Sequence, residues 1–233
     1  IRAEITTARR AGLYRFTYPN STESENAIEY IRNIFIEDQT PELYVKFMND
    51  YGHPLTVNEQ DSLIFRASVI KYEQKRYTES AIGFSAYVQK FPNGRYSLEA
   101  TNLMAEIAYS KQSYDTALVY FSKLADIAPN AYAERAALIA ARLNYFNYQN
   151  YDLAEKYFSI LLQIATQKEN ITEANKGLLR CQYKGGKWID ASKIALLIIE
   201  DKNSALDDIE MANMTIYHQN LIAGDTSAAL QII

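Results

Sequence analysis

Aromatic and small residues recur along the chain at intervals of 37 residues. An aromatic residue stands at positions 77, 114, 151 and 188, and a small residue follows three positions later in each copy, as Ser80, Ala117, Ala154 and Ala191. Two further aromatic series keep the same interval: Phe35, Tyr72, Tyr109, Phe146 and Tyr183, and then Phe47, Phe84, Phe121 and Phe158. Three series in one register indicate an internal repeat, which largely accounts for the 19 tyrosines.

Each period contains two stretches with the apolar spacing of an amphipathic helix. The stretch before the aromatic opener, such as Leu98–Lys111, is rich in Ala, Leu, Ile and Met at helical intervals. The stretch after it, such as Asp115–Ile127, repeats apolar residues at steps of three or four. Pro92 and Pro129 follow two of the second stretches, where a proline ends a helix. The pattern predicts an all-α fold of 37-residue helix–turn–helix repeats without any strand.

The repeated helix pairs predict a single solenoid over residues 1–233. We expect a leading helix at 1–17, helix pairs at about 22–50, 58–91, 95–128, 131–166 and 170–201, and a partial pair at 204–233. The joint at 49–58 contains Gly52 and Pro54, and Leu43 replaces the small residue, so a seam is expected there. The chain starts without Met, and we interpret it as a piece of a longer protein. Its apolar half pair at the C-terminal end predicts weak self-association.

The aromatic-opened turn, the small residue, the aromatic residue four positions later and the closing Pro-Asn resemble the tetratricopeptide (TPR) repeat. The resemblance covers nearly the whole chain, although the repeat is 37 residues long rather than the usual 34 or so. It implies a right-handed α-α superhelix, the TPR solenoid, whose concave groove binds a partner polypeptide without enzymatic activity. The segments Tyr87–Gly94 and Tyr18–Ser21 are similar to those of bacterial cell-envelope TPR proteins, of the BamD-like and Tol–Pal-associated type. This narrower resemblance implies a periplasmic or envelope-associated protein.

Composition and charge add few candidates for chemistry. The 24 Lys and Arg against 28 Asp and Glu give a net charge of −4, so no overall field favours nucleic acid. Cys181 is the single cysteine, which excludes an internal disulfide and a Cys-x-x-Cys zinc site. His53 and His218 lack metal-ligand spacing, and Lys184–Lys187 lacks the glycine spacing of a phosphate loop. We therefore predict no catalytic residue, no cofactor, no metal and no membrane-spanning segment.

The TPR resemblance places groove-facing residues on the first helix of each pair. In the first pair these include Glu25, Ile28 and Arg32. The predicted partner-binding groove comprises Phe35, Phe65, Tyr72, Asn102, Glu106, Tyr109, Leu143, Phe146, Lys176, Arg180, Tyr183 and Lys184. Apolar residues, among them Val69 and Ile139, replace the Lys and Asn that a chaperone-binding TPR clamp requires. Capture of an acidic C-terminal tail in that manner is therefore not expected.

Two questions stay open at the level of sequence. Lys176, Arg180 and Lys184 share one helix face, which is either a solvated face or a docking point for a carboxylate-bearing partner. The protein is either an interaction scaffold in a bacterial envelope complex or a helical module of a glycan-uptake or enzyme assembly. In the second case its chemistry lies outside this chain, and exposed aromatic residues bind the glycan.

Overall fold

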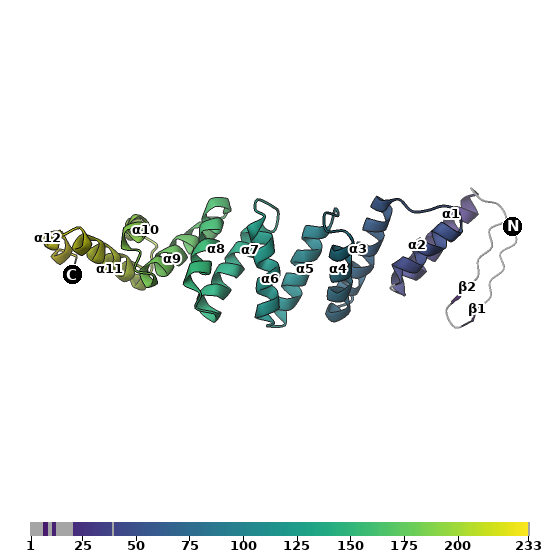
Figure 1. The fold of residues 1–233 in the computed structure, drawn as a ribbon, viewed down its shortest axis with the longest axis horizontal. Coiled ribbons are helices and arrows are strands. Elements are labelled where there is room, and N and C mark those ends of the chain that lie inside the picture. Colours follow the sequence, from purple (N-terminus) through teal and green to yellow (C-terminus); the bar gives the residue numbers. More distant parts are fainter. Residues whose placement is uncertain (1–6, 9–10, 13–20, 39, 233) are drawn as a thin grey trace. The chain divides into compact units, whose positions relative to one another are not determined.

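The computed structural model describes residues 7–8, 11–12, 21–38 and 40–232 of the chain. These residues belong to two compact units, Ile1–Ala100 and Thr101–Ile233, each of which is described by itself. Apart from two short strands, every regular element in the described ranges is a helix, and consecutive helices form pairs joined by short turns (Figure 1). The fold is therefore the all-α helical repeat, similar to a TPR solenoid, that the sequence predicts.

The helices follow one another as first and second members of successive pairs. In the first unit these are α1 (Thr22–Glu37) with α2 (Pro41–Asp50), and α3 (Val57–Glu73) with α4 (Tyr77–Lys90). Helix α5 (Ser97–Ser110) crosses the boundary between the units and precedes α6 (Tyr114–Asp126). The second unit continues with α7 (Ala133–Arg142), the π-helix η1 (Leu143–Asn147), α8 (Tyr151–Ile164), α9 (Lys168–Lys184), α10 (Trp188–Glu200), α11 (Leu206–Ile222) and α12 (Thr226–Leu230).

The N-terminal segment corrects one prediction. Of the predicted leading helix 1–17, the structure describes only β1 (Thr7–Ala8) and β2 (Ala11–Gly12), and the rest lies outside the described residues. These four residues form an antiparallel pair in which Thr7 faces Gly12, so neither a helix nor an absence of strands is correct here.

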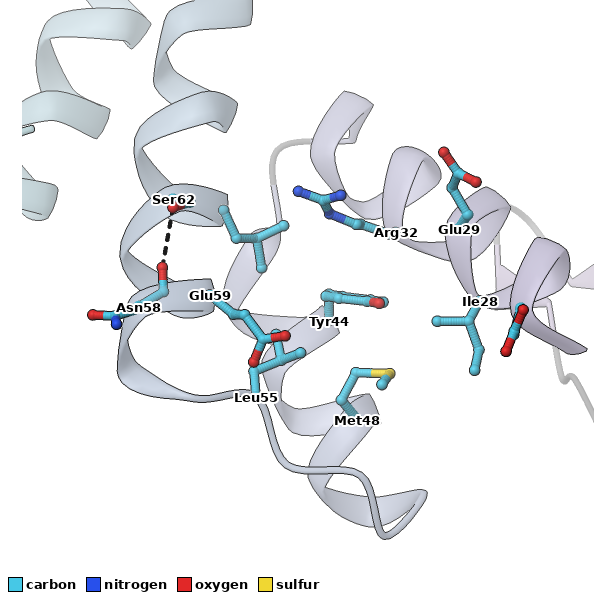
Figure 2. Close-up of a pocket in the computed structure, with 11 residues that line it drawn as sticks. Ile28, Glu29, Arg32, Tyr44, Met48, Leu55, Asn58, Glu59 and Ser62 are labelled. Atoms are coloured by element: carbon cyan, nitrogen blue, oxygen red, sulfur yellow. Dashed lines mark hydrogen bonds between the residues drawn. The ribbon is translucent and has the colours of Figure 1, made fainter. Parts of the chain in front are cut away.

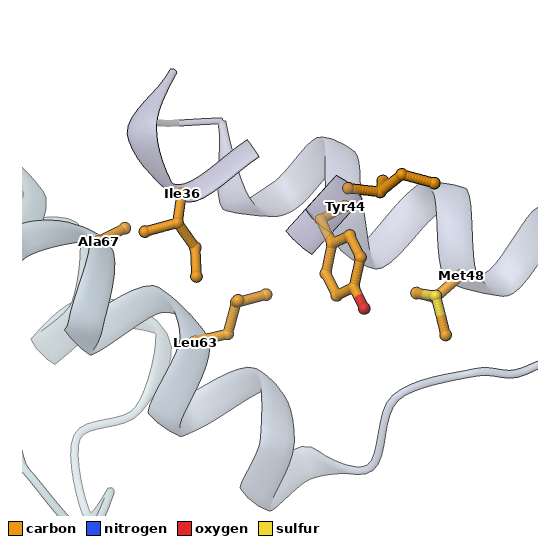
Figure 3. Close-up of a cluster of buried hydrophobic side chains, with 6 residues drawn as sticks. Ile36, Tyr44, Met48, Leu63 and Ala67 are labelled. Carbon is orange, nitrogen blue, oxygen red and sulfur yellow. The ribbon is translucent and has the colours of Figure 1, made fainter. Parts of the chain in front are cut away.

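In the first unit, α1, α2 and α3 pack against one another around one apolar cluster. Figure 3 shows Ile36 of α1, Tyr44 and Met48 of α2, and Leu63 and Ala67 of α3 converging on it. The irregular joint at 49–58 connects α2 to α3 within this unit.

A buried polar network fixes the end of α4. The Tyr87 hydroxyl donates to Asp61 of α3 and accepts from the Tyr96 amide at 3.0 Å, while the Arg95 amide donates to Asp61 at 2.9 Å. A Cβ on Gly94 would lie 2.6 Å from the Tyr87 hydroxyl oxygen, so the turn passes against this network. Burial, followed by the hydrogen bond to Asp61, raises the pKa of Tyr87 well above its usual value.

In the second unit, each helix packs on the next one from α6 to α12. First helices also contact one another: α7 packs on α9, and α9 packs on α11. The small residues near the start of the second helices are fully buried, as the close approach of paired helices requires: Ser80 in the first unit and Ala117, Ala154 and Ala191 in the second. A Cβ on Gly177 of α9 would lie 2.4 Å from the ring of Phe158 of α8, so these helices nearly touch.

The turn between the two helices of a pair repeats one backbone geometry. The amide of the residue just before the second helix donates to the carbonyl five positions earlier in Arg76–Lys71, Ser113–Ala108, Lys187–Gln182 and Asp225–Asn220. The residue before each of these donors has a positive φ, between 58° and 78°: Lys75, Gln112, Gly186 and Gly224. This is the Schellman motif, in which a left-handed residue lets the last carbonyls of a helix find donors.

An aromatic contact across the turn accompanies this backbone geometry. An aromatic residue near the end of the first helix meets the aromatic opener of the second, with ring centroids 5.1 to 5.7 Å apart, in Tyr72–Tyr77, Tyr109–Tyr114, Tyr145–Tyr151 and Tyr183–Trp188. Trp188 is half-buried and also stacks on His218 of α11 at 4.4 Å. Trp188 therefore joins its own pair to the following one.

The first pair departs from the 37-residue register by one position. Its equivalent turn bond runs from the Thr40 amide to the Phe35 carbonyl, 36 residues before Arg76–Lys71. Tyr44, 3% exposed, therefore occupies the small-residue position, whereas Leu43 is 53% exposed. By the same shift, Phe84 corresponds to Met48 and not to Phe47. Likewise, Tyr72 corresponds to Ile36 and not to Phe35. The sequence assignments in this pair are therefore wrong by one residue.

A π-helix shifts the register again in the fourth pair. In η1 the Tyr148 amide bonds to the Leu143 carbonyl, five residues back instead of four, which inserts one residue at the end of the helix. Tyr145 therefore takes the ring position that the 37-residue count assigns to Phe146. Phe146 instead points outward and is 60% exposed.

We expect the left-handed turn residue to control stability. Gln112→Gly should raise the free energy of unfolding by about 1 kcal/mol, because a side chain disfavours positive φ and glycine does not. Gly186→Gln should lower it by a similar amount, about 1 kcal/mol, through the backbone alone. The Gly186 site has room, since a Cβ would come no closer than 3.8 Å to Trp188. Urea unfolding of both variants measures this, and equal midpoints for the two would contradict it.

Candidate functional site

The structure divides the twelve predicted groove residues into three groups by exposure. Phe65 and Leu143 are buried, and Phe146 and Lys184 are exposed. The remainder are half-buried: Phe35, Tyr72, Asn102, Glu106, Tyr109, Lys176, Arg180 and Tyr183. The two buried residues belong to the core and are not available to a partner, which corrects their assignment.

The two corrections have separate causes. Phe65 stacks on Tyr96 with ring centroids 4.4 Å apart and an interplanar angle of 3°, and it also meets Phe84. Leu143 and Ile139 are buried because the π-helix displaces the preceding part of α7 by one residue. Counting back from that insertion, Leu138 and Arg142 occupy the positions that correspond to Asn102 and Glu106.

Ion pairs join first helices to one another in the second unit. Arg135 of α7 contacts Glu106 of α5 at 2.5 Å, and Arg142 of α7 contacts Glu173 of α9 at 2.9 Å. Further along, the buried carboxylate of Asp208 in α11 receives both Lys176 at 2.9 Å and Arg180 at 2.6 Å from α9. Two members of the predicted basic face are therefore paired within the chain, and only Lys184 of the three is exposed.

The reactive side chains in the described ranges are placed for packing rather than catalysis. Cys181 is buried, and its desolvation raises the thiol pKa to about 12, which keeps it protonated. His53 packs on Tyr51, and His218 packs on Trp188. No group of three His, Cys, Asp or Glu within the described part of the chain has metal-binding geometry. No helix in that part is both long and apolar enough to span a bilayer.

A pocket of about 610 Å³ opens between α1 and α3, the first helices of consecutive pairs (Figure 2). Its residues come from three helices and the joint before α3: Glu25, Ile28, Glu29, Arg32, Tyr44, Met48, Leu55, Asn58, Glu59, Ser62 and Leu63. Three of these, Glu25, Ile28 and Arg32, are residues that the sequence places on the groove face of the first pair. Tyr44 and Met48, which also belong to the apolar cluster, line the pocket from α2.

The polar groups of the pocket differ in how they are satisfied. Glu59 accepts hydrogen bonds from the Thr56 hydroxyl at 2.7 Å and the Thr56 amide at 2.8 Å, forming the capping box of α3. These bonds, with a smaller contribution from Arg32, lower the pKa of Glu59, so it is ionised. Within the described residues, neither Arg32 nor the Tyr44 hydroxyl has a hydrogen-bond partner.

The Tyr44 hydroxyl is the least satisfied of these groups. Its side chain is 3% exposed, and Figure 2 shows the hydroxyl directed across the pocket toward Ile28. Burial raises the pKa of Tyr44, with Arg32 opposing and Glu59 adding to the effect, so the hydroxyl stays neutral. The hydroxyl oxygen is open to the pocket and not fully enclosed, so a ligand that enters the pocket can form a hydrogen bond with it.

Comparison with known proteins leaves the family open. No family model and no curated protein matches the chain. Among solved structures, it is similar to a tetratricopeptide repeat protein from Parabacteroides merdae, with 15% sequence identity and a TM-score of 0.45. The match covers 90% of this chain and 77% of that protein.

Asp208 should make the stability of the second unit sensitive to acid. Burial opposes ionisation of this carboxyl, but the hydrogen bonds from Lys176 and Arg180 outweigh it and hold the pKa of Asp208 below its usual value. A lowered folded-state pKa contributes stability above the unfolded value of about 3.9, and this is lost as pH falls through the folded value. Asp208→Asn should therefore cost about 1–3 kcal/mol at pH 7 and progressively less below about pH 4.

The control for this variant is Asp207→Asn, which removes an exposed neighbouring carboxylate. Unfolding by urea at a series of pH values measures both. A constant difference between wild type and Asp208→Asn from pH 7 to pH 2 would show that the ion pairs do not act as described.

Two buried tyrosines of the first unit should respond differently to loss of the hydroxyl. Tyr44→Phe removes a hydroxyl that opens onto the pocket and bonds to no described residue, so it should leave stability nearly unchanged. Tyr87→Phe removes a hydroxyl bonded to Asp61 and Tyr96 and should cost about 1–3 kcal/mol. Thermal unfolding followed by circular dichroism compares them, and a loss in Tyr44→Phe as large as in Tyr87→Phe would reveal a partner for Tyr44.

Proposed function

We propose that this protein is a non-enzymatic scaffold that holds a partner polypeptide along the first helices of its repeats. The observation that carries the proposal is the pocket between α1 and α3, which combines apolar walls with polar groups that have no partner in the described residues. Adjacent first helices in the second unit, α7 with α9 and α9 with α11, also lie in contact and are joined by ion pairs, so they form a continuous surface. Such a surface suits an extended segment that contacts several repeats in turn.

We further propose that the scaffold belongs to a bacterial envelope complex of the BamD-like or Tol–Pal-associated type. The support is the resemblance of Tyr87–Gly94 to the repeat-closing segments of those proteins. In the structure the hydrogen bonds of the Asp61–Tyr87 network hold this segment against α3, so it is part of the packed repeat. Fractionation of cells that express the full-length protein with an epitope tag tests the location, and recovery in the cytosol would contradict it.

The glycan-binding alternative loses support from the packing of the aromatic residues. A glycan platform requires aromatic faces that are open to solvent, but Tyr72, Tyr109 and Tyr183 each pack on the opener of their own pair. Of the predicted groove aromatics, only Phe146 is largely exposed. One exposed ring fits a hydrophobic anchor for a polypeptide better than a sugar-binding surface.

Phe146 provides the test of partner binding. Phe146→Ala should weaken capture of the natural partner tenfold or more, because an aromatic anchor at the centre of an interface typically contributes about 2 kcal/mol. Val119→Ala is the matched control, since Val119 is 66% exposed but lies on α6, a second helix. Partners are identified by affinity purification from cells that make the protein, and the affinity of the purified partner is then measured for each variant.

Two results would contradict the proposed function. One is a partner whose affinity falls with Val119→Ala and not with Phe146→Ala, which would place binding on the second helices. The other is binding of soluble oligosaccharides that Phe146→Ala abolishes, which would favour the glycan alternative.

A further inference from the structure

We propose that the pocket between α1 and α3 takes a lysine or arginine side chain of the partner polypeptide. This inference rests on the proposed function and specifies the chemistry of the partner. The pocket has apolar walls, an excess of carboxylates and a tyrosine hydroxyl without a partner in the described residues, and a long aliphatic side chain that ends in a cation satisfies all three.

The charge of the lining favours a cation over an anion. Glu25, Glu29 and Glu59 line the pocket with Arg32 as the one cationic side chain, which leaves a formal charge of −2. Glu59 is ionised, and its bonds to Thr56 engage one carboxylate oxygen, so the other has no partner in the described residues. An anionic ligand would meet three like charges to gain one contact, which costs more than Arg32 returns.

The apolar part of the lining suits the methylene stem of the same side chain. Ile28 of α1, Met48 of α2 and Leu55 of the joint lie around the Tyr44 ring in Figure 2. Lysine and arginine bury such stems against apolar surface while their charged ends stay near polar groups. A methionine in the wall also adapts its shape to a flexible chain.

The Tyr44 hydroxyl supplies an independent reason for an N–H donor. It is neutral, 97% of its residue surface is buried, and it has no partner in the described part of the chain. Its oxygen opens onto the pocket and can accept a hydrogen bond from an ammonium or guanidinium group there. Charge, shape and hydrogen bonding therefore point to the same class of side chain.

The test uses a defined probe and a reporter inside the pocket. The probe is a fluorescein-labelled decapeptide of alternating lysine and serine, compared with the same peptide carrying glutamate or norleucine in place of lysine. Methyl-labelled methionine gives four NMR signals for the chain, of which Met48 is the only one that lines the pocket and is assigned by Met48→Leu. We expect the lysine peptide to shift the Met48 signal and to bind more tightly than both comparison peptides.

Variants then assign the recognition to single groups. Glu59→Gln, which preserves the capping box, should raise the Kd of the lysine peptide about fivefold, and Tyr44→Phe about threefold. Arg32→Gln should lower the Kd about threefold because it removes a like charge. Glu37→Gln, an exposed carboxylate of α1 outside the pocket, should leave the Kd unchanged.

Three outcomes would overturn the inference. The glutamate peptide shifts Met48 as strongly as the lysine peptide, or no peptide shifts it, or only N-acetyl-lysine methylamide shifts it while the peptide does not. The last result would show a site for a small cation instead of a polypeptide. None of them decides the proposed function, because Phe146→Ala against Val119→Ala tests partner capture in the second unit without using this pocket.

Discussion

The turn that closes each first helix is the constraint on which the repeat depends. Its hydrogen-bonded loop requires one residue with positive φ, and the chain supplies this residue at Lys75, Gln112, Gln149 and Gly186, each 37 residues after the last. The turn sets the direction in which the second helix leaves the first, and the aromatic contact across it fixes their separation. Only one of these four residues is glycine, so three repeats maintain the turn at a backbone cost that packing must offset.

The sequence predicts the elements of this fold better than it predicts the environment of single side chains. Periodic aromatic and small residues identify the helix pairs, because each of them meets a packing requirement that every repeat shares. No such requirement fixes the number of residues between consecutive repeats. One residue fewer before Thr40 and one residue more in η1 leave the helices in place but rotate their side chains by about 100°, the angle between successive helical residues.

Those two shifts explain why the candidate site was only partly predictable. The 37-residue count aligns Phe146 with Tyr72, Tyr109 and Tyr183, but the π-helix gives that position to Tyr145, and residue types alone do not predict a π-helix. Tyr44 was not expected in the site at all, since the 37-residue count places Leu43 at its position. The available signal was Pro41. A proline favours the first turn of a helix, so it marks the start of α2 and indicates that the spacing from this helix to the second helix of the next pair is shorter than 37 residues. Ion pairs such as Arg180–Asp208 join residues 28 apart, and neither spacing nor periodicity identifies them.

The pocket in the first unit contains the residue that this shift in register brings to the small-residue position. In later pairs a serine or alanine near the start of the second helix lets that helix lie close to the first helix of its pair. In the first pair the equivalent residue is Tyr44, whose ring centroid lies 6.0 Å from that of Phe35 and which lines the pocket between α1 and α3. A tyrosine thus stands in the pocket wall where the other pairs carry a small residue. Its hydroxyl has no partner among the described residues, so the departure from the repeat pattern supplies one of the groups by which the pocket would recognise its ligand.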